Sequence, residues 1–166
     1  MLLYHATTDA QHTGVFTPRL PDNIDCYDED DTIDRICVSD SIEGCLTSMP
    51  RGGEDLRDLL DDTGDRIKVF VFDTDTLGLP PNCIIEPDVI KDQYGVIDAV
   101  ITGEHWITAP VTIPTADTHI LHVHDFQINR TPIESGIIVG RIEQLRYTSL
   151  CGDNKTVQQN ACEVQA

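Results

Sequence analysis

The sequence predicts an α+β fold built on a mostly antiparallel β-sheet with short helices. Strand-length runs of apolar and β-branched residues recur along the chain, and apolar residues at helical spacing gather in its first half. No glycine-rich phosphate loop is present, which disfavours Rossmann and P-loop folds. At 166 residues the chain suits one domain, which we expect over residues 1–151, followed by a polar tail over 152–166.

Most of the expected elements are strands, indicated by alternating or continuous apolar residues. Their expected ranges are 2–7, 35–39, 66–73, 96–101, 104–113, 119–128 and 137–145. Pro110 implies an edge or a bulge in the fifth range, because proline cannot donate to a sheet ladder. In the sixth, alternation places His124 and Phe126 on one face and Leu121 with Val123 on the other.

Two helices are expected between the second and third strands. The first covers 41–49, where apolar residues recur at helical spacing, and Ser39 or Asp40 would cap its N-terminus. A proline follows it, and a second short helix is expected over 54–60. The aspartate-rich segment 22–34 has little apolar surface to bury and is interpreted as a solvated loop.

The charge is strongly acidic, with 29 acidic residues against 11 basic ones and a formal net charge of −18. Such a surface repels phosphate backbones, so direct binding to a nucleic-acid backbone is not expected. Three interpretations of the acidity stay open: solubility, a high-salt host, or a partner with a basic surface, including mimicry of nucleic acid. Composition alone does not separate them.

The six cysteines contain no CxxC pair, which disfavours a zinc ribbon or a thioredoxin-like site. Cys37 and Cys45 lie among apolar neighbours and are interpreted as buried small residues. Cys151 and Cys162 could pair near the C-terminus, although a cytosolic environment would keep them reduced.

The chain has no run of 18 apolar residues, and its first residues lack the basic and apolar regions of a signal peptide. No membrane association is therefore expected. The expected location is the cytoplasm, or the host cytoplasm if the protein is viral.

Three short segments contain chemically useful residues in a suggestive order. They are Tyr4-His5-Ala6-Thr7, then Ile36-Cys37-Val38-Ser39-Asp40-Ser41 leading into a helix, then Thr102-Gly103-Glu104-His105-Trp106. Across residues 2–113 this pattern resembles the three-part signature of the ADP-ribosyltransferase superfamily, including its small phage-encoded members. The resemblance implies a split β-sheet, NAD as cofactor, and transfer of ADP-ribose to a macromolecular acceptor such as a protein.

The resemblance also implies catalytic roles for Glu104 and His5. Breaking the bond between nicotinamide and ribose leaves positive charge on the ribose, which a nearby carboxylate stabilises. Glu104 is the candidate for that carboxylate, and His5 would donate a hydrogen bond to a ribose hydroxyl. The competing interpretations are an exposed acid at a strand start and a partly buried structural histidine.

The remaining candidates would bind the cofactor. Ser39 and Ser41 could bond its ribose or amide, although both equally suit helix capping. Arg19 could pair with the pyrophosphate or hold a surface carboxylate. Tyr94 and Trp106 could stack on its rings or fill the core.

Thr7 completes the first segment and is included among the cofactor-binding candidates. The residue two before Glu104 is Thr102, whereas some members of the superfamily carry Gln or Glu there to select the acceptor. This departure argues against arginine as the acceptor.

The sequence also leaves room for two functions other than ADP-ribose transfer. His122 and His124 share a strand face and could ligate zinc with His105 or Asp125, but no HxxxH or HExxH pattern supports this and no metal is expected. The main alternative to an enzyme is a binding, inhibitory or structural protein whose acidic face docks on a basic partner, such as a nucleic-acid-binding host protein, which would fit a viral origin.

Overall fold

The computed structural model describes residues 1–21, 30–80, 82–133, 136–151 and 156–157. Most of the segment expected as an aspartate-rich loop lies outside these residues, and so does most of the expected C-terminal tail. The architecture is α+β, and every strand pair in the described residues is antiparallel. The predicted fold class is confirmed at this level.

The main sheet has eight strands in the order β10-β9-β8-β4-β1-β3-β6-β5. Their bounds are β1 Leu2–Thr7, β3 Ile36–Ser39, β4 Arg66–Asp73, β5 Ile84–Ile85, β6 Glu104–Ile107, β8 Thr118–Pro132, β9 Ile138–Cys151 and β10 Thr156–Val157. A separate two-stranded ribbon pairs β2 (Val15–Phe16) with β7 (Val111–Thr112).

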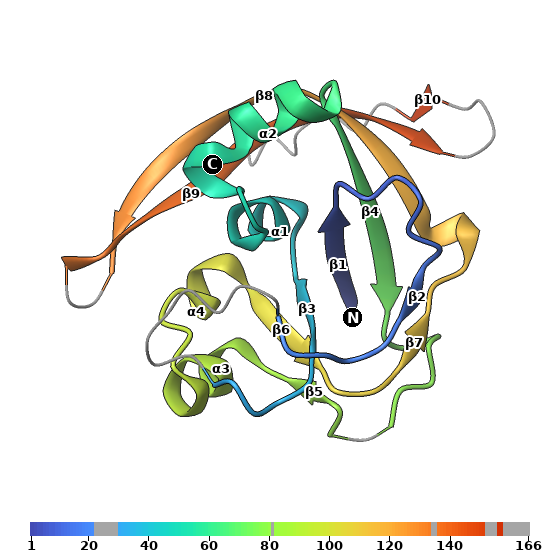
Figure 1. The fold of residues 1–166 in the computed structure, drawn as a ribbon, viewed down its shortest axis with the longest axis vertical. Coiled ribbons are helices and arrows are strands. Elements are labelled where there is room, and N and C mark those ends of the chain that lie inside the picture. The colour runs from blue at the N-terminus through green and yellow to red at the C-terminus, as the bar shows by residue number, and fades with distance from the viewer. Residues whose placement is uncertain (22–29, 81, 134–135, 152–155, 158–166) are drawn as a thin grey trace, which may run out of the picture.

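Helices lie against one face of this sheet and the ribbon lies against the other (Figure 1). The helices are α1 Ile42–Ser48, α2 Leu56–Thr63, α3 Pro87–Tyr94 and α4 Ala99–Thr102, with 3-10 turns at Gly53–Asp55 and Thr115–Asp117. Because side chains alternate along a strand, Ala6 packs with the helices whereas Leu3 packs with the ribbon. Each face of β1 is therefore covered by a different layer.

Local chemistry explains where the helices begin and end. Ser41, rather than the predicted Ser39 or Asp40, caps α1 by accepting a hydrogen bond from Gly44 N at 3.2 Å. Gly64 ends α2 in the left-handed conformation, at φ 64°.

Two predicted strands differ in the structure, and one helix was not predicted. The expected strand 96–101 is wrong, because its C-terminal part forms α4 and buries Ala99 against Trp106. The expected strand 104–113 divides into β6 and β7 on either side of Pro110, and these belong to different sheets. Helix α3, which Pro87 initiates, was not predicted from the sequence.

The long β8–β9 hairpin changes face along its length. Register shifts flank Asp125, which pairs with Arg146 of β9, and the next pair is Gln127 with Glu143. A bulge adds one residue and reverses the alternation, so Phe126 joins Leu121 and Val123 in the same core. The predicted segregation of Phe126 to the other face is therefore wrong.

The sheet has two parts that meet between β1 and β3. The only pair in register there is Tyr4 with Ser39, whereas β1 pairs with β4 at six positions. Beyond Tyr4, no ladder pair joins the rest of β1 to β3. This single junction is the feature that positions the candidate site.

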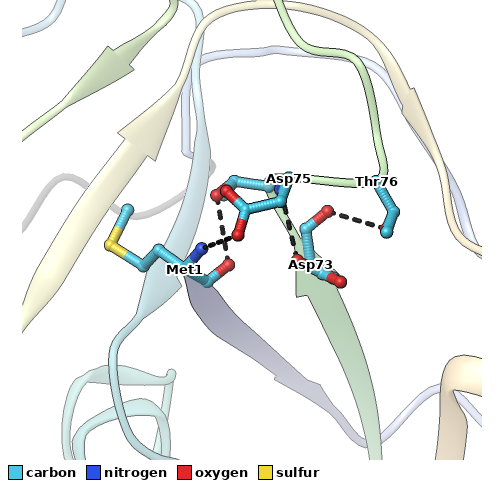
Figure 2. Close-up of polar contacts among 5 residues, drawn as sticks. Met1, Asp73, Asp75 and Thr76 are labelled. Atoms are coloured by element: carbon cyan, nitrogen blue, oxygen red, sulfur yellow. Dashed lines mark hydrogen bonds and ion pairs between the residues drawn. The ribbon is translucent and has the colours of Figure 1, made fainter.

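The start of β1 is fixed on the side away from β3. The Met1 amino group lies 3.1 Å from Asp75 Oδ2, and Thr74 donates to the Met1 carbonyl from both its backbone nitrogen and its hydroxyl (Figure 2). The turn after β4 itself is held by Asp73, which accepts from Asp75 N and Thr76 Oγ1. These contacts tie β1 to β4 and leave its other edge to the junction with β3.

Candidate functional site

The three segments singled out in the sequence form neighbouring strands. β3 lies between β1 and β6, and Ser39 is paired with Tyr4 on one side and Glu104 on the other. Directly paired residues project to the same face of a sheet. Tyr4, Ser39 and Glu104 therefore form one row on the face that carries the helices.

Glu104 is buried, with 8% of its surface accessible. Its Oε1 accepts a hydrogen bond from Trp106 Nε1 at 2.7 Å, and both residues project from β6 to the same face. The guanidinium of Arg35 stacks on Trp106, with Cζ 4.0 Å from the ring centroid. The alternative of an exposed strand-start acid is therefore wrong, since this carboxylate is held in a polar cluster inside the protein.

Ser39 lies beneath α1. Its hydroxyl donates to the Thr102 carbonyl at 2.6 Å, and 1% of its surface is accessible. A Cβ at Gly44 of α1 would lie 2.2 Å from Ser39 Oγ and 2.0 Å from Thr102 O, so only glycine permits this approach. Ser39 consequently links β3, α1 and α4 and has no room for a direct ligand contact.

His5 occupies the junction between the two parts of the sheet. Its Nδ1 lies 2.8 Å from the Cys37 carbonyl, an oxygen that can only accept, so Nδ1 carries the proton. Burial is the largest influence and lowers the pKa of His5; the hydrogen bond to the Cys37 carbonyl acts in the opposite direction, and His12 and Arg19 add smaller lowering effects. The neutral ring leaves Nε2 as an acceptor, whereas the resemblance implies that His5 donates.

His5 and Glu104 project to opposite faces of the sheet. His5 follows Tyr4 by one residue and packs against Phe16 of the ribbon, while Glu104 shares the helix face with Tyr4. The strands of the predicted site are adjacent, but its two candidate catalytic side chains do not converge on one face.

The other candidates divide between the two faces. Tyr94, at the end of α3, packs on buried Trp106 with 5.2 Å between ring centroids, so Trp106 lies in the core and partly buried Tyr94 covers it. Ser41 caps α1. Thr7 ends β1, where its hydroxyl accepts from Asp9 N, and Arg19 bridges Arg35 beside β3.

Two further polar residues of this region are buried: Arg35, which was missed in the sequence, and His105, which the sequence offered only as a possible zinc ligand. Arg35 is 2% exposed and donates from Nη1 to the carbonyls of Asp30 and Ile33, and an arginine entering an apolar strand is the signal that could have found it. His105 is also buried, with Nδ1 2.9 Å from Gly103 O and Nε2 2.9 Å from Glu86 Oε2.

Within the described residues, no group of three or more histidine, cysteine or acidic side chains is arranged to hold a metal ion. His122 and His124 do lie together, with ring centroids 4.9 Å apart, but His105 is bonded to Glu86. No described helix is long and apolar enough to cross a membrane.

Comparison with known proteins adds no relative: no family model, no curated protein and no solved structure matches the chain. The resemblance to ADP-ribosyltransferases therefore stays a prediction, and any function has to be argued from this chain's own residues.

Proposed function

We propose that the protein uses NAD to transfer ADP-ribose to a macromolecular acceptor, with Glu104 as the catalytic residue. The observation that supports this best is the adjacency of β1, β3 and β6. A histidine strand, a hydroxyl-bearing strand that feeds α1, and a glutamate strand are the three parts that the resemblance implies. Their spatial proximity is not required by their separation in the sequence, since β1 and β6 are about 100 residues apart.

The side chains near the junction suit the chemistry of NAD. Neutral His5 offers Nε2 as an acceptor for a ribose hydroxyl, and the charge of Arg19 is close enough to affect the pKa of His5. Arg19 therefore supplies positive charge for a phosphate. When bound, NAD supplies a glycosidic bond whose cleavage leaves positive charge on the ribose, and Glu104 would stabilise that charge.

The positions of these residues define what the proposal requires. Because His5 and Glu104 project to opposite faces of the sheet, NAD would bind on the Glu104 face, and His5 would not contact the same ribose. Ser39 would act as a positioning residue, since its bond to Thr102 O fixes the strand beside Glu104. Trp106 would orient the carboxylate through its indole N–H.

The experiment measures nicotinamide release and transfer of label from NAD to proteins of a lysate. Glu104→Gln should lower the rate about 10²- to 10³-fold, the usual effect of removing one group that stabilises a transition state. Glutamine keeps an oxygen for Trp106 Nε1, so the melting temperature should change little. Glu143→Gln is the matched control, because Glu143 Oε1 accepts from exposed Asn129 on the hairpin, and the substitution should leave the rate unchanged.

Two results would reject the transferase. One is a wild-type protein that neither consumes NAD nor labels any acceptor; the other is equal activity in wild type and Glu104→Gln. Capture of a basic partner that is lost with salt and unaffected by Glu104→Gln would instead favour the acidic docking protein.

A further inference from the structure

The β8–β9 hairpin runs on beyond the other strands of the main sheet (Figure 1). On the side of β8 away from β9, β4 pairs with β8 only as far as His122. Residues 127–130 of β8 are all exposed, so neither face of the strand is fully covered there. In the described part of the chain, this stretch of β8 is therefore an edge strand with β9 as its one neighbour.

The backbone groups of two residues on this edge point outward, away from β9. Ile142 of β9 is the ladder partner of Ile128, yet its N–H donates to the Thr47 hydroxyl at 2.9 Å. In this pair the N–H and C=O groups therefore point away from each other, as they do at every second position of an antiparallel ladder. Because no register shift follows Gln127, Arg130 has the same orientation as Ile128.

The open part of the edge is limited at both ends. Pro132 is the next outward-pointing residue and has no N–H to donate. At the other end, the N–H of Phe126 already donates to Asp125 Oδ1 at 3.0 Å. Within the described residues, Ile128 and Arg130 make no backbone hydrogen bond on this side of β8. Their N–H and C=O groups are therefore available to another extended strand.

The charges of the chain favour a second copy of the protein as that strand. With a net charge of −18, two copies repel each other over most of their surfaces. The edge from Gln127 to Pro132 has no acidic residue, and its one charged residue, Arg130, is neutralised by Glu54 of the same chain at 2.6 Å. Ile128, 38% exposed, adds apolar surface. Two copies therefore approach with little repulsion along this edge.

We propose that two copies of the protein pair antiparallel through this edge of β8 and form a dimer with one continuous sheet. With the two-fold axis at Asn129, Ile128 of one copy lies opposite Arg130 of the other, and each such pair exchanges both of its N–H···O bonds. The arrangement places no like charges opposite each other. The inference is independent of the proposed use of NAD. Because Pro132 limits the contact, the dimer is weak and forms as the concentration rises.

Sedimentation velocity over a range of protein concentrations tests the dimer. Wild type should dimerise reversibly. Ile128→Lys should weaken the dimer about tenfold, because it removes apolar contact and places a lysine opposite Arg130 at both symmetric positions. Val100→Lys is the matched control, since Val100 is also exposed, at 49%, but lies on α4. It adds the same charge away from the edge and should dimerise as wild type does.

Backbone amide exchange supplies a second readout that identifies the surface. As the dimer forms, the amides of Ile128 and Arg130 should become protected, whereas the amide of Asn129 points toward β9 and should change little. A protein that stays monomeric at every concentration, a dimer equally stable in Ile128→Lys, or a dimer without added protection of these two amides would overturn the inference. Nicotinamide release tests the transferase separately, so failure of one proposal leaves the other standing.

Discussion

The two parts of the main sheet differ in whether their polar side chains are buried or exposed. Buried polar side chains of the described residues come from the β3–β6 part and the segments entering it: Arg35, Ser39, Thr102, Glu104 and His105. On the β8–β9 hairpin, charged groups are exposed and pair at the surface, as Arg146 does with Asp125 at 2.8 Å. The core beneath the hairpin is formed by apolar residues.

This difference indicates where function is to be sought. Burying a polar group costs free energy unless partners satisfy it, so a buried polar cluster persists only where its neighbours are fixed. Exposed ion pairs carry no such requirement and contribute little. The β3–β6 part therefore holds side chains in defined orientations, which the exposed charges of the hairpin do not require.

The largest difference is expected between two glutamate substitutions. Glu104→Ala should lower the free energy of unfolding by about 3 kcal/mol, because it leaves the Trp106 indole N–H unpaired and opens a cavity. Glu143→Ala on the hairpin should change it by less than about 0.5 kcal/mol. Urea denaturation of both variants measures the contrast, and similar losses would contradict it.

A smaller effect is expected from glycine substitutions. Gly44→Ala should cost about 2 kcal/mol, because its Cβ meets the Thr102 carbonyl and α1 has to move. Gly64→Ala has open space around its Cβ and only the strain of φ 64°, so about 1 kcal/mol is expected. Thermal unfolding of the two should rank them in this order; the reverse order would show that α1 is not tightly packed on β3.

We expect the folding stability of the protein to depend on pH through His5 at the junction between β1 and β3. Burial lowers the pKa of His5, so the unfolded chain takes up a proton at higher pH than the folded protein does. Stability should therefore be complete above the unfolded pKa of about 6.5 and should fall as the pH drops through the folded pKa. His5→Gln should flatten this part of the stability profile, and an unchanged slope would exclude His5 as its source.

The smallest effect is expected on the hairpin surface. Arg130 Nε lies 2.6 Å from Glu54 Oε1, but both side chains are exposed. Arg130→Gln should leave the melting temperature nearly unchanged, and the small difference should vanish in high salt. A large shift would show that this contact fixes the hairpin against the 3-10 turn at Gly53–Asp55.

Much of the fold follows from local pattern. Continuous apolar and β-branched residues identified β1, β3 and β4, and the apolar face of 41–49 identified α1. Short elements were harder: residues 99–102 carry β-branched side chains yet form α4, because Ala99 packs on Trp106 there. Tertiary contacts overrode propensity at that position.

The sequence predicted the strands that form the candidate site but not the face of the sheet to which each side chain projects. The order of His5, Ser39 and Glu104 indicated three strands that do lie side by side. Which face each side chain takes depends on register, and a shift of one residue reverses it.

The sequence by itself determined the α+β class, the acidity of the surface, and the apolar segments that become the core strands. These follow from composition and periodicity, which act over a few residues. Tertiary structure alone decided that Glu104 is buried against Trp106, that α1 closes over Ser39, and that β1 meets β3 at a single pair. Those features arise from contacts between segments tens of residues apart. Composition and periodicity act over a few residues and do not specify which distant segments come into contact.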